Sequence, residues 1–240
     1  AYTPSPICVP ARAAFATELR VHQTRHWDNA SPYTGSPRGW GHVLQRRSVR
    51  VESIGKLHYR AEEDPAGFDK EHIPMHVVGG YGMVWASIRD PYVVSPSSKR
   101  MLGERIGPGE SSYTAYDREV TARAVQWIRE AAARRDEPFV LYVGLVAPHF
   151  PLIAPEAFYA LYPLHSLPEP KLHPAQGYQR HPWVQAYADF MDNEQQFDGP
   201  QERLQAFAAY YGLCSFLDHN VGAIMQALRE AGFESDTTVI

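Results

Sequence analysis

The 240-residue sequence predicts an α/β fold, in which a mostly parallel sheet is flanked by helices on both faces. Two candidate strands, Val49 to Ile54 and Phe139 to Val146, are separated by a helical segment, Thr114 to Arg135. A longer helical segment, Pro200 to Ala231, follows and leads into a further short strand, Thr237 to Ile240. Strands that alternate with helices in this order form parallel sheets with crossover helices.

The expected strands are recognised by their side-chain patterns. Val49 to Ile54 alternates apolar and polar residues and runs directly into Gly55. Ile73 to Val78 is expected to form a second short strand that ends at Gly79. Phe139 to Val146 is almost continuously apolar, which is typical of a parallel strand covered on both faces, and the prolines that follow prevent further sheet.

The expected helices are marked by periodicity and by capping residues. The first long helix should begin with a capping box made by Thr114 and Asp117. Its apolar stripe consists of Val120, Ala124, Ile128 and Ala131. The second should begin at Pro200 and end before Gly232. Its apolar face consists of Leu204, Phe207, Tyr211, Phe216, Val221, Ile224 and Leu228.

The remaining segments are expected to be connections with short helices. Helices are expected over residues 39–47 and near 155–161. Residues 21–40 are rich in aromatic residues and helix breakers and are expected to be loop. Residues 90–113 are rich in Pro, Ser and Gly, so they predict a long surface excursion that helps to shape a substrate pocket. Residues 152–185 otherwise form a connection rich in Pro and His.

Composition narrows the function classes. The chain is 44% hydrophobic and 21% charged, and its net charge of −4 gives no basic field that would favour nucleic acid or an anionic membrane. Two cysteines are too few for a disulfide framework, and no apolar run is long enough to span a membrane. With few cysteines and no visible export signal, a cytoplasmic location is expected. We expect a single domain over residues 1–240 that is cut at both ends, because it opens inside a loop and closes inside a strand.

The segment around Cys8 carries the clearest chemical signal. Pro10 fits the first position of a helix, which would place Cys8 just outside the helix N-terminus. The unpaired N–H groups at that end favour a thiolate and bind oxyanions. Arg12 lies four residues after Cys8, so both side chains should share one helix face. The pattern predicts a nucleophile beside a fixed positive charge and an anion site.

Three further side chains are expected near that nucleophile because they follow strands. Ligands of open parallel sheets bind beyond the carboxyl ends of the strands. Lys56 and His58 follow one strand, and if the chain stays extended, both side chains point to the same side. Gly55 would allow close approach of the backbone, and His149 follows the other strand. Such a cluster suits a small oxygenated anion, namely a sulfate or phosphate ester.

These residues fall within motifs that resemble those of a known family. Cys8-Val9-Pro10-Ala11-Arg12 resembles the C-x-P-[S/A]-R signature of the formylglycine-dependent sulfatases, which belong to the alkaline phosphatase superfamily. Gly55 to His58 looks like their G-K-x-H motif, and Ala147 to Pro151 looks like their P-H-x-P motif. Leu217 to Gly222 resembles the segment that precedes their last metal-binding loop. The order of the motifs is that of the family, and Trp27-Asp28-Asn29 is closest to bacterial choline-sulfatase-like members.

The resemblance implies a sulfuric ester hydrolase that cleaves a sulfate monoester. Cys8 would be converted to formylglycine by the formylglycine-generating enzyme, and the hydrate of this aldehyde would supply the attacking oxygen. Arg12 would hold the formylglycine, Lys56 and His149 would bind the sulfate oxygens, and His58 would assist release. Trp27 would contact the substrate.

The resemblance also implies a divalent cation, with Ca²⁺ foremost and Mg²⁺ or Mn²⁺ as second choices. Formylglycine at position 8 would be one ligand, and the remaining ligands are expected upstream of Ala1 and beyond Ile240. For the alcohol part of the ester, an aromatic box for a choline-like cation is one option, with packing roles as the other. Its walls would be Trp27, Trp40 and Tyr59.

One residue departs from the family pattern, and three different functions would also suit this cluster. Family members have Gly where Glu18 follows Thr17, so the helix is expected to end differently and modification of Cys8 is less assured. The same anion site would suit a phosphate or phosphonate ester hydrolase. It would also suit a non-catalytic anion-binding protein with unmodified Cys8, or a protease-type thiol hydrolase that uses Cys8 and His149. Assembly into a homo-oligomer is left open.

Overall fold

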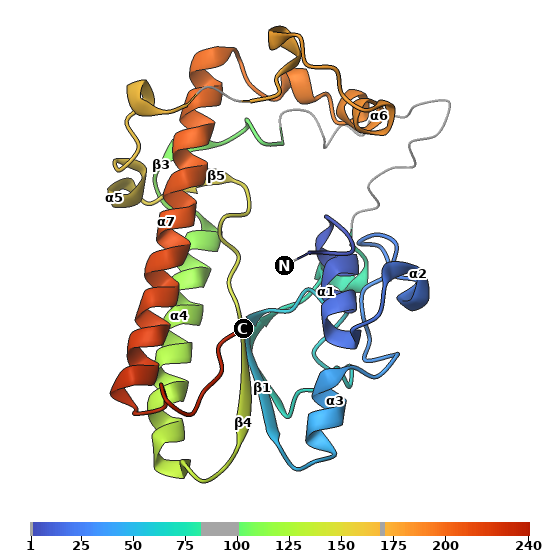
Figure 1. Cartoon of the computed structure of the whole chain (residues 1–240), viewed down its shortest axis with the longest axis vertical. Helices are drawn as coiled ribbons and strands as arrows, with labels where there is room; N and C mark the ends of the chain where they lie inside the picture. Colours follow the sequence, from blue (N-terminus) through green and yellow to red (C-terminus); the bar gives the residue numbers. More distant parts are fainter. Residues whose placement is uncertain (1, 83–100, 169–170) are drawn as a thin grey trace. The chain divides into compact units, whose positions relative to one another are not determined.

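The computed structural model describes residues 2–82, 101–168 and 171–240 (Figure 1). The chain forms two compact units. The first unit comprises Ala1–Trp85, Asp117–Leu145 and Val221–Ile240, and the second comprises Ala86–Tyr116 and Val146–Asn220. Each unit is described by itself, and the single domain expected over residues 1–240 stays a prediction.

The first unit is built on a parallel sheet of the order β2-β1-β4. Its strands are β1 (Arg50–Lys56), β2 (Lys70–Met75) and β4 (Phe139–Gly144). In the β1–β4 ladder, Arg50 pairs with Phe139 and Gly55 with Gly144 without a break, whereas the β1–β2 ladder shifts register between Ile54 and Lys56. The expected parallel α/β arrangement is therefore confirmed.

Helices cover both faces of this sheet. Figure 1 shows α1 (Cys8–Thr17) and α3 (Trp40–Gln45) on one side of β1 and β4. On the other side, α4 (Ser112–Ala131) lies next to the C-terminal part of α7 (Pro200–Glu230). A short helix, α2 (Val21–Thr24), follows α1.

Each face buries its own apolar core. Under α1, the buried cluster consists of Ala13, Ala16, Tyr33, Leu57, Tyr59 and Ala66, with Phe68 and Tyr142 packed against it. Under α4, the predicted stripe is at most 1% exposed at each of its four positions. There the Trp127 ring packs on Phe139, and Phe139 packs on Phe233, with ring centroids 4.9 Å and 5.4 Å apart.

A buried carboxylate ties α4 to the sheet. Glu52 on β1 accepts hydrogen bonds from Trp127 Nε1 at 2.7 Å and from His72 Nε2 at 2.6 Å. Burial alone would raise the pKa of Glu52, but these two hydrogen bonds and the charge of Arg50 together lower it. The charge on this strand is therefore held by partners on three sides.

The second unit contains a small parallel sheet and several short helices. Its strands are β3 (Ile106–Pro108) and β5 (Leu152–Ala154), and its helices include α5 (Glu156–Tyr159), α6 (Pro182–Phe190) and the larger part of α7. Gly212 on α7 lies so close to β5 that a Cβ on it would be 2.9 Å from the Ala154 Cβ. Short 3₁₀ turns occur in this unit at Leu164–Ser166, Pro174–Gln176 and Asn193–Gln195, and in the first unit at Val78–Gly80 and Ala132–Arg134.

Some predicted strand positions are wrong. The strand expected over Ile73 to Val78 lies at Lys70–Met75, because pairing with β1 decides which residues extend. Thr237 to Ile240 is not a strand, since it forms no ladder with any strand that the structure describes. Of the excursion expected over 90–113, residues 90–100 lie outside the described residues, and 101–113 include β3. Strand β5 was not expected either.

The helix predictions hold better than the strand predictions. The helices expected over 39–47, near 155–161 and from Pro200 to Gly232 are confirmed. The capping box is wrong, because the Ser111 hydroxyl accepts from the Thr114 N–H at 3.1 Å while Asp117 is buried inside the helix. Helix α2 occupies part of the segment expected to be loop, and α6 begins within the connection expected over residues 152–185. On α7, Val221 is 42% exposed and does not belong to the apolar face.

Substitution of Gly55 tests whether the close approach of β1 and β4 supports the first unit. A Cβ on Gly55 would lie 2.4 Å from the Gly144 carbonyl oxygen, and its φ of +96° is strained for other residues. Gly55→Ala should lower the free energy of unfolding by about 2–4 kcal/mol, measured by chemical denaturation.

The matched control is Gly222→Ala on α7. A Cβ there would meet nothing within 4 Å, so this change should raise the free energy of unfolding by about 0.5–1 kcal/mol. If both variants lost a similar free energy of unfolding, the close approach of Gly55 to Gly144 would not be what makes the Gly55 substitution costly.

Candidate active site

Cys8 is the first residue of α1 and does not lie outside it as predicted. Ile7 has extended backbone angles and caps the helix without a side-chain hydrogen bond. Pro10 is therefore the third helical residue. Its missing N–H costs nothing there, because the backbone N–H groups of the first helical turn have no carbonyl acceptor within the helix. Cys8 and Arg12 are one helical turn apart, as expected.

Glu18 takes the left-handed conformation that suits the glycine of the family pattern. Its φ is 60°, and its backbone N–H donates to the Ala14 carbonyl at 2.8 Å. The helix thus ends after Thr17, and the expectation that Glu18 changes its end is wrong. The Glu18 side chain is exposed, so only a modest backbone cost accompanies this turn.

Asn29 contacts both Cys8 and the N-terminal end of α1, and sequence reasoning missed it as a site residue. Its Oδ1 accepts from the Val9 backbone N–H at 3.0 Å, and its Nδ2 lies 3.3 Å from Cys8 Sγ. The residue is 8% exposed, so these contacts are largely shielded from water. An oxygen atom at the position of Cys8 Sγ would find the same amide as a donor. The only sequence signal was its place after Trp27-Asp28.

Arg12 is held at one end of its guanidinium group. Its Nη1 donates to the Lys56 carbonyl at 2.8 Å and to the Tyr142 hydroxyl at 2.9 Å. Its Nε and Nη2 donate to no residue that the structure describes. One edge of the group is therefore anchored, and the other edge keeps its donors for a ligand.

Lys56 is a buried cation at the carboxyl end of β1. It is 4% exposed, and its ammonium group donates no hydrogen bond to a described residue. Burial lowers the pKa of Lys56 and the positive charge of Arg12 lowers it further, whereas Cys8 and Asp117 act in the opposite direction. These electrostatic couplings join the predicted residues Cys8, Arg12 and Lys56 into one cationic site.

His58 does not continue the strand, so the predicted alternation with Lys56 fails. β1 ends at Lys56, and His58 has a left-handed φ of 57°. Its backbone N–H donates to the Met75 carbonyl at 2.8 Å, next to the register shift between β1 and β2. His58 is half-buried close to Lys56 in the chain, and its catalytic role stays a prediction.

His149 belongs to the second unit, so its predicted place beside Cys8 stays a prediction. Within that unit, its ring lies edge-on to Tyr113 with centroids 5.6 Å apart. Nδ1 is 2.6 Å from the Phe150 carbonyl oxygen, and because a carbonyl only accepts, Nδ1 carries the proton. This contact makes Nε2 the acceptor nitrogen of the neutral ring.

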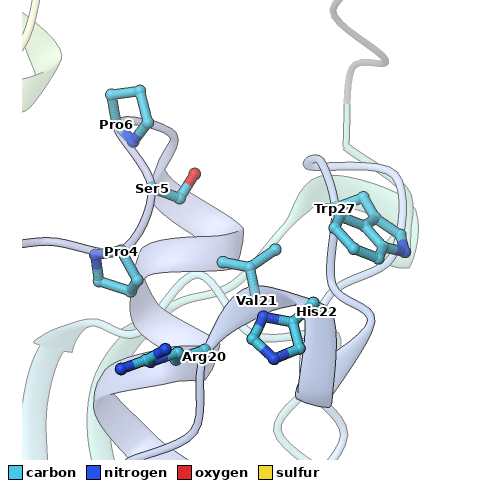
Figure 2. A pocket seen from close by; sticks show the side chains of 7 residues that line it. All are labelled: Pro4, Ser5, Pro6, Arg20, Val21, His22 and Trp27. Atoms are coloured by element: carbon cyan, nitrogen blue, oxygen red, sulfur yellow. The ribbon is translucent and has the colours of Figure 1, made fainter.

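Trp27 lines a hollow of about 490 Å³ formed by the segment that leads into α1 and by the start of α2 (Figure 2). Its indole is 61% exposed. The aromatic box is not formed, because Tyr59 is buried against Tyr33 and Trp40 packs edge-on to Phe15 and Phe68. The lining residues are Pro4, Ser5, Pro6, Arg20, Val21, His22 and Trp27.

The described residues do not form a metal cage. Over 2–82, 101–168 and 171–240, no group of three or more His, Cys, Asp or Glu side chains is placed to bind an ion. The predicted ligand at position 8 therefore belongs to no such group in the described part of the chain. None of its described helices is long and apolar enough to cross a membrane.

Comparison with known proteins agrees with the motifs. The model of the sulfatase family matches residues 1–240. Arylsulfatase K of Bos taurus is 28% identical over 254 residues, covering 100% of this chain and 44% of its own length. Choline-sulfatase of Rhizobium meliloti (strain 1021) is 28% identical over 251 residues, covering 100% of this chain and 48% of its own. The chain thus spans about half the length of these curated relatives.

A solved structure shares the fold. Phosphonate monoester hydrolase of Agrobacterium radiobacter superposes with a TM-score of 0.67 at 17% identity, covering 98% of this chain and 52% of that one.

Two substitutions of Asn29 test its contact with α1. Asn29→Ala should lower the free energy of unfolding by about 1–2 kcal/mol, because it leaves the Val9 N–H without its acceptor. Asn29→Asp should recover most of this loss, because a carboxylate accepts the same bond and is favoured at a helix N-terminus. Chemical denaturation of both variants checks this, and an Asp variant as unstable as the Ala variant would contradict it.

Lys56→Met tests the cost of the buried cation. Met is similar in size and uncharged, so the free energy of unfolding should rise by about 1 kcal/mol at neutral pH. Because the pKa of Lys56 is lowered in the folded state, this gain should shrink as the pH rises through that lowered pKa. Thermal and chemical denaturation against pH measure both effects.

Inorganic sulfate should raise the melting temperature of the parent protein and not that of Lys56→Met. The control is Lys70→Met at an exposed position on β2, which should leave the sulfate effect intact. If sulfate still raised the melting temperature of Lys56→Met, Lys56 would not be part of the anion site.

Proposed function

The chain belongs to the sulfatase family, and from this premise we propose that it hydrolyses sulfate monoesters with a nucleophile derived from Cys8. The observation that carries the proposal is the cationic site at the start of α1. There a cysteine at a helix N-terminus lies within electrostatic reach of a buried Lys56, and Arg12 bonds to the carbonyl of that same lysine. Three sources of positive potential thus surround one nucleophilic position.

The cationic groups provide what a sulfate ester needs. The ammonium group of Lys56 and the Nε–Nη2 edge of Arg12 would bind non-bridging oxygens of the sulfate group. Because Lys56 is desolvated, its interaction with an anion is stronger than in water, and binding of the anion would restore its proton affinity. The Tyr142 hydroxyl and the Lys56 carbonyl hold Arg12 so that little side-chain entropy is lost on binding.

Residue 8 would supply the attacking group. Formylglycine, once made from Cys8 by the formylglycine-generating enzyme, would provide a hydrate, and one of its hydroxyls would attack sulfur while the S–O bond to the alcohol breaks and the alcohol leaves. The second hydroxyl would then lose its proton, so that the aldehyde re-forms as the C–O bond to the sulfate group breaks and sulfate is released. Asn29 would orient this residue by donating from Nδ2, while its Oδ1 stays bonded to the Val9 N–H. His58 would accept the proton during release, and His149 would donate from Nε2 to a sulfate oxygen when its ring is protonated at both nitrogens.

A divalent cation, with calcium foremost, belongs to the proposal as a property of the family. The described residues do not fit such an ion, because they include no cluster of three or more His, Cys, Asp or Glu side chains placed to bind it. We therefore derive no step through it.

The proposal is tested by comparing substrates and by identifying residue 8. 4-Nitrophenyl sulfate should be hydrolysed faster than 4-nitrophenyl phosphate or 4-nitrophenyl phenylphosphonate, and mass spectrometry of the active protein should find formylglycine in the peptide that contains residue 8. Cys8→Ala should lower kcat by at least about a thousandfold. The control is Cys214→Ala, which changes the other free cysteine and should keep the activity.

Each competing function has its own outcome in this experiment. Preference for either phosphorus ester would favour a phosphate or phosphonate ester hydrolase. Activity with an unmodified thiol that iodoacetamide abolishes would favour a thiol hydrolase. Binding of sulfate without turnover of any ester, and with Cys8 unmodified, would favour a non-catalytic anion-binding protein.

A further inference from the structure

The hollow that Trp27 lines begins next to the nucleophile. Pro6 is only two residues before Cys8, a span of roughly 7 Å at most in an extended chain. On its other side, Trp27 is two residues before Asn29, whose amide nitrogen is 3.3 Å from Cys8 Sγ. An ester whose sulfur atom lies at residue 8 must extend its alcohol part by several ångströms. The end of the hollow that Pro6 and Trp27 form is within that reach.

The one charged side chain that lines the hollow is that of Arg20, and it has no counter-ion among the described residues. Arg20 and His22 line it on one side, and both side chains are exposed (Figure 2). The guanidinium group of Arg20 forms no ion pair and donates no hydrogen bond to a described residue, and the imidazole of His22 has no such partner either. None of the lining residues is acidic. An anion placed here would meet unused donors and a fixed positive charge.

Apart from Ser5, the remaining lining residues of the hollow are apolar. The exposed indole of Trp27 stands across from Val21 and the prolines that lead into α1 (Figure 2). Indole faces and proline rings bury apolar or ring-shaped groups with little loss of side-chain entropy. The hollow therefore combines an apolar surface with one cationic edge.

We propose that this hollow binds the alcohol part of the sulfate ester and selects alcohols that carry a second anionic group, such as a carboxylate, on a ring or apolar frame. The inference rests on the proposed function, and it narrows the substrate class. A choline-like cation does not fit here, because Arg20 repels it and the lining offers the single indole of Trp27 in place of a cage of aromatic rings.

Three phenyl sulfates that differ in the charge of the para substituent test the inference. They are 4-carboxyphenyl sulfate, phenyl sulfate and 4-(trimethylammonio)phenyl sulfate, compared by kcat/KM. The carboxylate ester should exceed the neutral ester by about tenfold, and the neutral ester should exceed the cationic one. In Arg20→Gln, the kcat/KM of the carboxylate ester should fall to that of the neutral ester.

The matched control is Arg38→Gln, which removes the same charge from an exposed residue outside the hollow and should keep the ratio. Equal kcat/KM for the three esters, preference for the cationic ester, or the same loss of ratio in both variants would overturn the inference.

A second measurement separates this inference from the proposed function. Calorimetry with 4-hydroxybenzoate, phenol and 4-hydroxyphenyltrimethylammonium examines the hollow without any sulfate group. If no ester is hydrolysed but 4-hydroxybenzoate binds most tightly and depends on Arg20, the proposed function fails and the anionic site stands. If esters are hydrolysed without any charge preference, the sulfatase function stands and the inference about the hollow fails.

Discussion

The close approach of β1 and β4 at their carboxyl ends is the constraint on which the first unit depends. A Cβ on Gly55 would lie 2.4 Å from the Gly144 carbonyl oxygen, and a Cβ on Gly144 would lie 2.2 Å from the Lys56 carbonyl oxygen. Only glycine at both positions lets the ladder continue unbroken to its end. The Lys56 carbonyl and the Tyr142 hydroxyl then meet Arg12 together, so the sheet itself positions the guanidinium group beside Cys8.

Two buried charges on β1 have opposite environments. Glu52 receives hydrogen bonds from His72 and Trp127, and its pKa is lowered in spite of its burial. Lys56, four residues further along, is buried and its ammonium group donates to no described residue, and its pKa is lowered by that burial and by Arg12. The first charge stabilises the packing of α4 on the sheet. The second costs folding free energy, which is expected of a group that is reserved for an anionic ligand.

Sequence reasoning predicted the elements that are marked by a local residue pattern. It failed for strands whose bounds depend on pairing with residues far away in the sequence. The apolar stripe of α4 has helical periodicity, and Pro200 is typical of the first position of a helix. Both helices form. β2 lies three residues earlier than expected, because its bounds follow the ladder with β1 and not its own pattern. β3 and β5 are three residues long each and pair only with one another, so their sequences carry too little pattern to be recognised.

The sequence by itself determined the family and the spacing of Cys8 and Arg12, because its motifs are those of the family and a helix places residues four apart on one face whatever surrounds it. Only the tertiary structure decided what those residues contact. Asn29 meets Cys8 across 21 residues, and Tyr142 meets Arg12 across 130, through contacts that depend on how α1 packs on the sheet. The sequence also did not predict the hollow beside Trp27. Arg20 and His22 face the segment before α1 only in the folded chain.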